Sequence, residues 1–320
     1  EPLWTALEEA GLTAGFVDEE FGGAGIEISD ACEILRVAGR FAVPVPLAET
    51  MLGGWLLAQG GITFPGGRLA VAPVREADRL SIDGSGVLNG TARDVPFASE
   101  ADTFAVLAMR DRQPVIACVD AASCRIADGL SLADDPKDDV IFDGVPTTDA
   151  VDAPDAFDAN SLLMMGALAR SCGMAGALEA MLDISVTYSQ DRVAFERPIS
   201  KFQAVQHNLA RLAGEVAAAV CAAASAADAL QRAGTFDDEV LFEIAAAKIR
   251  VGEAAGEGAG IAHQVHGAIG FTMEHILQRY SRRVWSWRDE FGSESAWAVR
   301  LGEAVAANGG DELWASLAAR

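Results

Sequence analysis

The distribution of proline divides the 320-residue chain into two halves of different character. Ten of the eleven prolines lie at or before Pro154, and only Pro198 lies beyond it. Proline lacks a backbone N–H and its ring clashes with the preceding helical turn, so it interrupts helices. The second half of the chain is therefore free to form long helices, whereas the first half is not.

Apolar spacing in the second half predicts a helical bundle. Leu209, Leu212, Val216 and residues 219–220 recur at three- and four-residue intervals on an alanine-rich background, which gives a long helix one apolar face. The same spacing predicts further helices over residues 160–190, 239–263 and 274–288. Four long helices joined by short loops are typical of an up-and-down bundle.

The first half combines two other patterns. Short apolar runs alternate with clusters of Gly, Asp, Ser and Pro in residues 66–150, which indicates strands and turns; the runs are 69–72, 103–107 and 115–119. Before them, helical spacing occurs over residues 4–10, 28–41 and 47–59. We therefore predict an α+β, mostly α, fold with an N-terminal helical domain (1–65), a small middle β-barrel-like domain (66–154) and a C-terminal four-helix bundle (155–320).

The charge of the chain restricts its partners. The sequence holds 24 basic and 47 acidic residues, a net charge of −23, which repels nucleic-acid phosphates and anionic lipids alike. We therefore expect neither nucleic acid nor membrane as a partner. An anionic ligand would need a local basic cluster, and the densest one consists of Arg279, Arg282, Arg283 and Arg288.

Cysteine and histidine usage predicts neither disulfides nor a metal site. The five cysteines are scattered, odd in number and free of C-x-x-C spacing, which is typical of reduced thiols. His263 and His266 lie three residues apart without a carboxylate partner, so we expect no metal. The chain has no uninterrupted apolar stretch of about 18 residues and no basic, then apolar, N-terminus, and we therefore expect a cytoplasmic protein.

Two segments of the second half resemble flavin-contacting segments of the acyl-CoA dehydrogenase family. They are Gln264-Val-His-Gly-Ala-Ile-Gly-Phe271 and Asp191-Arg-Val-Ala-Phe-Glu-Arg-Pro198, the latter followed by Phe202-Gln203. Residues 17–23 and 86–91 are also family-like, and the order of domains is the same, so the resemblance covers nearly the whole chain. It implies FAD as cofactor, an acyl-CoA thioester as substrate and an electron-transfer flavoprotein as electron acceptor.

The resemblance assigns these segments to the FAD of a neighbouring subunit. The implied contacts to adenine and pyrophosphate come from Arg192, Phe195, Phe202, Gln203, Gln264, Gly267 and Gly270. The chemistry suits the ligand, because a guanidinium offers a planar fork of donors to phosphate and glycine lets backbone amides approach it closely. The family usually has two adjacent glycines, whereas this chain has Gly267-Ala268. An alternative for Gln203 is a capping box with Ser200 at the start of a helix.

No catalytic residue can be assigned from the resemblance. The family removes the α-proton of the substrate with a glutamate, and its two known positions correspond here to Gly166 and Phe291, neither of which accepts a proton. Nearby carboxylates are Asp289, Glu290 and Glu294, which we expect to be solvated surface acids. The segments 72–79 and 92–97 also lack the hydroxyl and amide residues with which the family lines the flavin ring.

Three hypotheses follow from this pattern. The first is a homo- or hetero-oligomeric subunit that completes a FAD site in trans for a catalytic acyl-CoA dehydrogenase partner, similar to the paired short dehydrogenases that act on CoA esters of steroid side chains. The second is a self-sufficient homo-oligomeric dehydrogenase with a displaced carboxylate base. The third is a flavin-free scaffold subunit.

Overall fold

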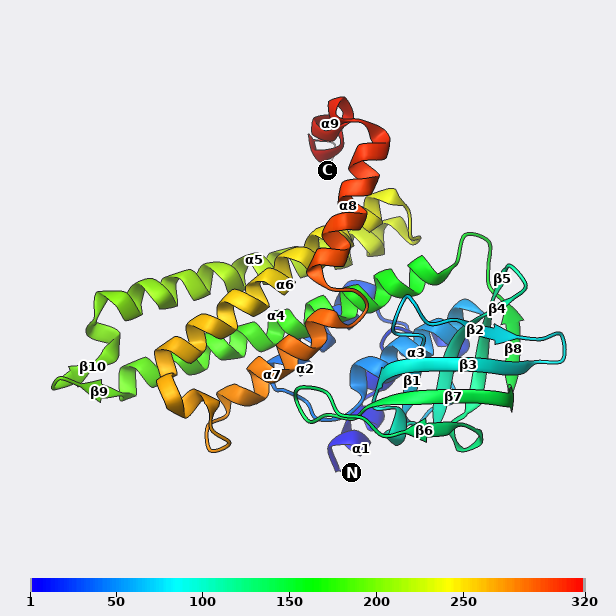
Figure 1. Cartoon of the computed structure of the whole chain (residues 1–320), viewed down its shortest axis with the longest axis horizontal. Coiled ribbons are helices and arrows are strands. Elements are labelled where there is room, and N and C mark those ends of the chain that lie inside the picture. Colours follow the sequence, from blue (N-terminus) through cyan, green and yellow to red (C-terminus); the bar gives the residue numbers. More distant parts are fainter. Residues whose placement is uncertain (1, 319–320) are drawn as a thin grey trace.

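The computed structural model describes residues 2–318, and it has the expected order of helices, sheet and helical bundle (Figure 1). The N-terminal part contains α1 (Pro2–Glu9), η1 (Leu12–Ala14), η2 (Glu19–Phe21), α2 (Ile28–Arg40) and α3 (Leu47–Gln59). α3 is buried on nearly every side and packs against β1 and β4, which joins this part to the sheet. The α+β, mostly α, fold class is confirmed.

The middle part is one mostly antiparallel eight-stranded sheet. Its strands are β1 (Leu69–Ala72), β2 (Leu80–Ile82), β3 (Val87–Pro96), β4 (Thr103–Arg110), β5 (Gln113–Asp120), β6 (Arg125–Ala127), β7 (Lys137–Pro146) and β8 (Asp149–Asp152). The hydrogen-bonded order is β6-β7-β3-β2-β4-β5-β8, with β1 pairing in parallel with β4. The three apolar runs of the sequence are β1, β4 and β5, whose central residues are buried.

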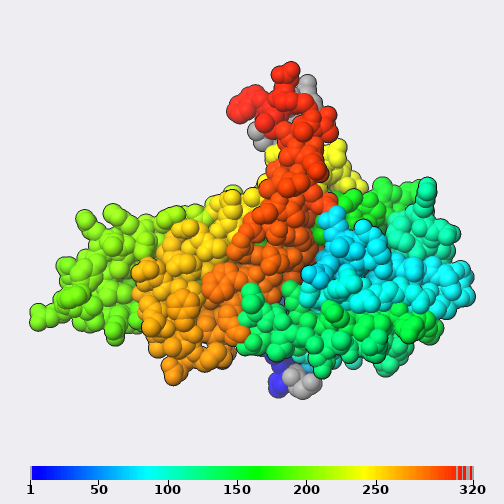
Figure 2. Space-filling model, in the orientation of Figure 1, coloured from blue at the N-terminus to red at the C-terminus, as the bar shows by residue number. Residues whose placement is uncertain are grey.

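The helical part is built on α4 (Ala159–Asp191), α5 (Gln203–Ala233), α6 (Asp238–His266) and α7 (Leu277–Asp289). It also has α8 (Glu294–Asn308) and α9 (Leu313–Ala318), and α8 projects away from the body (Figures 1 and 2). A small hairpin of β9 (Val193–Ala194) and β10 (Arg197–Pro198) separates α4 from α5. The turn η5 (Ile199–Lys201) precedes α5, and η6 (Gly267–Phe271) follows α6; η3 (Ala98–Glu100), η4 (Ala121–Ser123) and η7 (Gly310–Glu312) are the remaining short turns.

α4 is the central helix of the structure. Asp158 caps its start by accepting hydrogen bonds from the N–H groups of Asn160 and Ser161. α2 crosses α4 at close range, because a Cβ at Gly39 would lie 2.0 Å from the carbonyl oxygen of Gly173. Two helices can approach this closely only where both present small residues.

One helix differs from the sequence prediction. α7 begins at Leu277 rather than at residue 274 and has only 13 residues, so the bundle consists of three long helices and one short one. The N–H of Leu277 donates to Nδ1 of His275 at 3.1 Å, and this local hydrogen bond fixes the later start. An apolar periodicity does not reveal such a side-chain cap.

Two helices, α4 and α5, are long and apolar enough to cross a membrane by length and composition alone. The apolar window of α4 is wholly buried inside the protein, which makes α4 a core helix. Only 28% of the window of α5 is buried, so a long face of small residues remains uncovered in the single chain.

Candidate functional site

The two residues at which the resemblance implies a base, Gly166 and Phe291, meet in this structure, and an aromatic ring fills the space between them. Gly166 lies in the second turn of α4, and Phe291 lies in the turn between α7 and α8. A Cβ at Gly166 would lie 2.2 Å from Cδ1 of Phe291. The ring of Phe291 is buried, its backbone φ is +53°, and its carbonyl oxygen accepts a hydrogen bond of 2.9 Å from Nε1 of Trp297. Neither of these two residues can accept a proton, and the ring of Phe291 fills the space beside Gly166.

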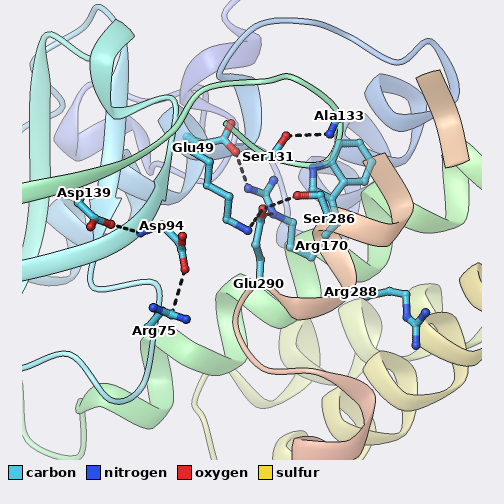
Figure 3. A network of polar contacts seen from close by, with 12 residues as sticks. Glu49, Arg75, Asp94, Ser131, Ala133, Asp139, Arg170, Ser286, Arg288 and Glu290 are labelled. Atoms are coloured by element: carbon cyan, nitrogen blue, oxygen red, sulfur yellow. Dashed lines mark hydrogen bonds and ion pairs between the residues drawn. The ribbon is translucent and has the colours of Figure 1, made fainter. Parts of the chain in front are cut away.

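Glu290 is buried in an ionic cluster, so the expectation that it is a solvated surface acid is wrong. Nε of Arg170 lies 2.6 Å from Oε2 of Glu290, an ion pair without hydrogen-bond alignment, and Nζ of Lys137 lies 3.1 Å from Oε1. Arg170 also donates a hydrogen bond of 2.5 Å to Glu49 (Figure 3). We call Glu49, Lys137, Arg170 and Glu290 the ionic cluster. It joins α3, β7, α4 and the α7–α8 turn.

The other two acids near this turn do not replace the base either. Asp289 is exposed, as expected. Glu294 is half-buried rather than solvated, because it forms an ion pair with Arg288. The start of α8 therefore carries no unpaired carboxylate near the Phe291 ring.

The electrostatics of the ionic cluster disfavour proton transfer. Burial alone raises the pKa of a carboxyl group, but Arg170 and Lys137 hold the pKa of Glu290 below its usual value. Burial raises the pKa of Glu49, with Arg170 opposing it. Burial lowers the pKa of Arg170, but the neighbouring Glu290 and Glu49 raise it by more than burial lowers it, so Arg170 stays charged. Glu290 is therefore an ionised structural partner and a poor proton acceptor.

Ion pairs hold the two segments that the resemblance places beside the flavin ring. In the segments 72–79 and 92–97, Arg93 lies 2.5 Å from the buried Asp78, and Arg75 lies 3.1 Å from Asp94. Arg300 of α8 pairs with Glu76 and donates to Asn160. A cavity of about 270 Å³ lies beside the first of these segments, and it is lined by residues of 73–80, by Leu107 and Met109 of β4 and by the start of α4.

The arginine cluster of α7 is not available for a CoA ester. Arg282 forms an ion pair with Asp134, and Arg283 makes a two-pronged pair with Asp135 at 2.7 and 2.9 Å. Arg288 pairs with Glu294, so three of the four charges are neutralised within the chain. In the single chain, these three arginines are therefore bound to carboxylates of the same chain.

The residues assigned to a neighbour's FAD lie at the other end of α4, which we call the distal end (residues 188–203 and 263–276; Figure 1). Arg192 follows the last residue of α4, and its exposed side chain has no partner within residues 2–318. Phe195 at the hairpin tip is 90% exposed, and both it and Glu196 have positive φ values, +51° and +65°. Such values are costly for residues other than glycine and cluster at functional sites.

Phe202 and Gln203 stand beside this hairpin. The rings of Phe195 and Phe202 meet edge to face at 6.2 Å, and Arg197 lies 4.2 Å above the ring of Phe202. Gln203 is the first residue of α5 and is exposed; its side chain makes no hydrogen bond among the described residues. The N-cap is Phe202 and has no side-chain cap bond, so the capping-box alternative for Ser200 and Gln203 is wrong.

The glycine loop completes the distal end. Gln264 is exposed on the last turn of α6, and Gly267 has φ +65° with open space where a Cβ would point. Gly270 is buried, because a Cβ there would lie 3.0 Å from Cβ of His266 and 3.1 Å from Leu277. The backbone at Gly267 is thus open to close approach, although its own N–H donates to the carbonyl oxygen of His263, whereas Gly270 is required by packing within the chain.

The two histidines of this loop are buried and neutral. His263 shares a hydrogen bond of 2.9 Å with Ser281, and His266 uses Nδ1 toward the carbonyl oxygen of Ala262 at 2.8 Å. Burial lowers the pKa of both imidazoles. Residues 2–318 contain no group of three or more His, Cys, Asp or Glu side chains that is arranged to hold a metal.

The distal end and the Phe291 position are too far apart to belong to one site. Twenty-six residues of α4 separate Gly166 from Arg192, which corresponds to about 39 Å of helix. An extended dinucleotide does not reach from one to the other. In a chain of net charge −23, the distal end is balanced in charge, because Arg192, Arg197 and Lys201 stand against Asp191, Glu196 and Glu274.

Comparisons with known proteins agree with this geometry. A family model described as acyl-CoA dehydrogenase, C-terminal domain, matches residues 158–294. Acyl-CoA dehydrogenase IpdE2 of Mycolicibacterium smegmatis is 31% identical over 299 residues, which cover 88% of this chain and 81% of that protein. IpdE2 of Mycobacterium tuberculosis is 30% identical, with 89% and 80% covered. The chain belongs to the acyl-CoA dehydrogenase family, a family of flavoprotein oxidoreductases.

Two solved structures are similar over nearly the whole chain. A chain of the ChsE4–ChsE5 complex from Mycobacterium tuberculosis has a TM-score of 0.84 at 23% identity, with 95% of this chain and 88% of that chain covered. A variant of the Tcur3481–Tcur3483 steroid ACAD has a TM-score of 0.84 at 26% identity, with 96% and 89% covered. The first name describes a complex, and the second joins two protein names.

The ionic cluster is the part of the site that sequence reasoning missed. One signal was present, because Arg170 is the only charged residue between Asn160 and Ala177, an otherwise apolar helical segment. A lone charge in a buried helix needs a buried partner. Its two partners, Glu49 and Glu290, come from distant segments, so the sequence alone does not identify them.

Proposed function

We propose that this chain is a partner subunit of an acyl-CoA dehydrogenase, which completes the FAD site of a second, catalytic subunit in trans. The observation that carries the proposal is the contrast between the two ends of α4. At one end, a phenylalanine ring and an ionic cluster occupy the place of the base. At the other, Arg192, Phe195 and Gln203 are exposed, and the described part of the chain offers none of them a side-chain hydrogen bond or ion pair.

The distal end fits the adenine and pyrophosphate part of FAD. Arg192 offers a charged fork to a phosphate, the exposed ring of Phe195 offers a face for stacking, and the open space at Gly267 lets a ligand approach the backbone closely. When bound, FAD supplies the acceptor for the hydride that leaves the β-carbon of an acyl-CoA thioester. The residues of this chain hold and orient the cofactor, and the partner's carboxylate removes the α-proton.

The self-sufficient alternative has less support. Its displaced carboxylate would be Glu290, which is paired with Arg170 and Lys137 and therefore has a lowered pKa. A base must be free to approach the α-carbon, and Glu290 is committed on both oxygens. We further propose a cytoplasmic heteromer that acts on the CoA ester of a bulky acyl group and passes electrons to an electron-transfer flavoprotein.

Flavin retention by the assembled complex tests the proposal. The chain is co-expressed with a glutamate-bearing acyl-CoA dehydrogenase subunit, and FAD affinity is measured by fluorescence titration. We expect Arg192→Ala and Gln203→Ala to weaken FAD binding about tenfold or more, because a charge-assisted contact contributes roughly 1.5–3 kcal/mol. The control is Arg232→Ala, at the far end of α5, where the arginine pairs with Asp228.

Two results would count against the proposal. If Arg192→Ala, Gln203→Ala and Arg232→Ala all bind flavin equally well, Arg192 and Gln203 do not hold FAD, and the scaffold hypothesis is favoured. A yellow, active chain in the absence of any partner would establish the self-sufficient dehydrogenase.

A further inference from the structure

Lys248 of α6 is fully buried, and its Nζ contacts the end of α7. The ammonium donates three hydrogen bonds, to the carbonyl oxygens of Trp287 at 3.0 Å, Arg288 at 3.0 Å and Glu290 at 2.9 Å. The last carbonyls of a helix lack partners within the helix. Lys248 satisfies three carbonyls at the end of α7, directly before Phe291.

The number of donors matters, because only the charged form of lysine has three N–H groups. Neutral Lys248 would leave one carbonyl oxygen buried without a donor. The end of α7 therefore has its full set of hydrogen bonds only while Nζ is protonated. The next residue, Phe291, is in the left-handed region with φ +53°, a conformation that depends on its surroundings.

We propose that Lys248 is a positioning residue whose ammonium clamps the α7–α8 turn and so holds the ring of Phe291 against Gly166. Loss of one proton from Nζ releases one carbonyl and loosens the turn. The hydrogen bonds of Lys248 do not depend on the proposed function. The role of the clamp, to keep the chain's own base position filled by Phe291, rests on the proposed function.

The surroundings of Nζ make this proton labile. Burial lowers the pKa of Lys248 to about 7, with Glu290 opposing the shift and Arg170 adding to it. Glu294 of α8 and Asp289 of α7 also favour the charged form of Lys248, but to a smaller extent. The remaining charged side chains of this region are Glu49 on α3, Lys137 on β7 and Arg288 on α7, each of which is in an ion pair.

Trp297 provides a local reporter, because its Nε1–H donates to the carbonyl oxygen of Phe291 and its side chain is fully buried. The isolated chain is labelled with 5-fluorotryptophan, and the ¹⁹F resonance of Trp297 is assigned with Trp297→Phe. We expect this resonance to shift between pH 6 and 9 with a midpoint close to 7. The shift should persist in Lys201→Met, which removes an exposed lysine at the distal end, and disappear in Lys248→Met.

Lys248→Arg provides a second variant in case Lys248→Met does not fold. Arginine keeps its charge throughout this range, so the resonance should stay at its low-pH position. A wild-type resonance that does not titrate, or one that titrates equally in either Lys248 variant, would overturn the proposal. The experiment uses no flavin and no partner, so its outcome is independent of the test of the proposed function.

Discussion

The contact between Gly166 and Phe291 predicts that Gly166→Ala destabilises the wild-type chain but stabilises a chain that already carries Phe291→Ala. In the wild-type chain, Gly166→Ala places a Cβ 2.2 Å from Cδ1 of Phe291, a distance at which the ring must move. Overpacking a core in this way typically costs about 1–3 kcal/mol. In a Phe291→Ala background the ring is gone, and alanine then favours the helix over glycine by about 0.5–1 kcal/mol. The coupling between the two positions is therefore roughly 1.5–4 kcal/mol.

Urea-unfolding midpoints of the four chains of this double-mutant cycle measure the coupling. Phe291→Ala alone should be destabilised by about 3–5 kcal/mol, because it leaves a cavity the size of the ring. Gly260→Ala is the matched control, since Gly260 lies within α6 and has open space at its Cβ position. It should stabilise both backgrounds alike. Equal effects of Gly166→Ala in both backgrounds would refute the claim that the ring fills this space.

Three further outcomes follow from the buried charges. Arg170→Met should destabilise the chain by about 3–5 kcal/mol in thermal unfolding, and adding Glu49→Gln and Glu290→Gln should restore most of this loss. As a control, Arg40→Met removes an exposed ion pair and should change the stability by less than about 1 kcal/mol. Because the pKa of Glu290 is lowered in the folded chain, its contribution to stability is fully present above the usual pKa of 4.5 and is lost as the pH falls below it. Glu290→Gln should therefore reduce the change of the melting temperature with pH between pH 3 and 6. Between about pH 7 and 10.5, Lys248 binds fewer protons in the folded state than in the unfolded state, so the free energy of unfolding should rise with pH across this window. In urea titrations, Lys248→Met should reduce this rise.

The sequence was sufficient for the fold because its signals are local. The position of Pro154, the apolar runs of β1, β4 and β5 and the spacing in α5 each depend on residues close in the chain. The division into domains at residues 65 and 154 remains a proposal, and β8 ends at Asp152 while α4 begins at Ala159. The late start of α7 was missed because a side chain, His275, sets it.

The site was only partly predictable for the same reason. The motif around Gly267 is contiguous, so its residues were found together, whereas the ionic cluster assembles from α3, β7, α4 and the α7–α8 turn. The sequence also indicated that Gly166 and Phe291 cannot accept a proton. It gave no sign that the two residues touch, because 125 positions separate them and only the packing of α4 against α7 brings them together.

The flavin content of the assembled complex tests the central claim most directly. The complex of this chain with a glutamate-bearing partner is purified, and FAD is released and quantified against the concentration of each polypeptide. The account predicts one FAD for each pair of chains and none on this chain alone, because its own base position is filled by Phe291 and its distal residues serve the partner. Two FAD per pair, or a stoichiometric flavin on the isolated chain that bleaches with an acyl-CoA under anaerobic conditions, would contradict it.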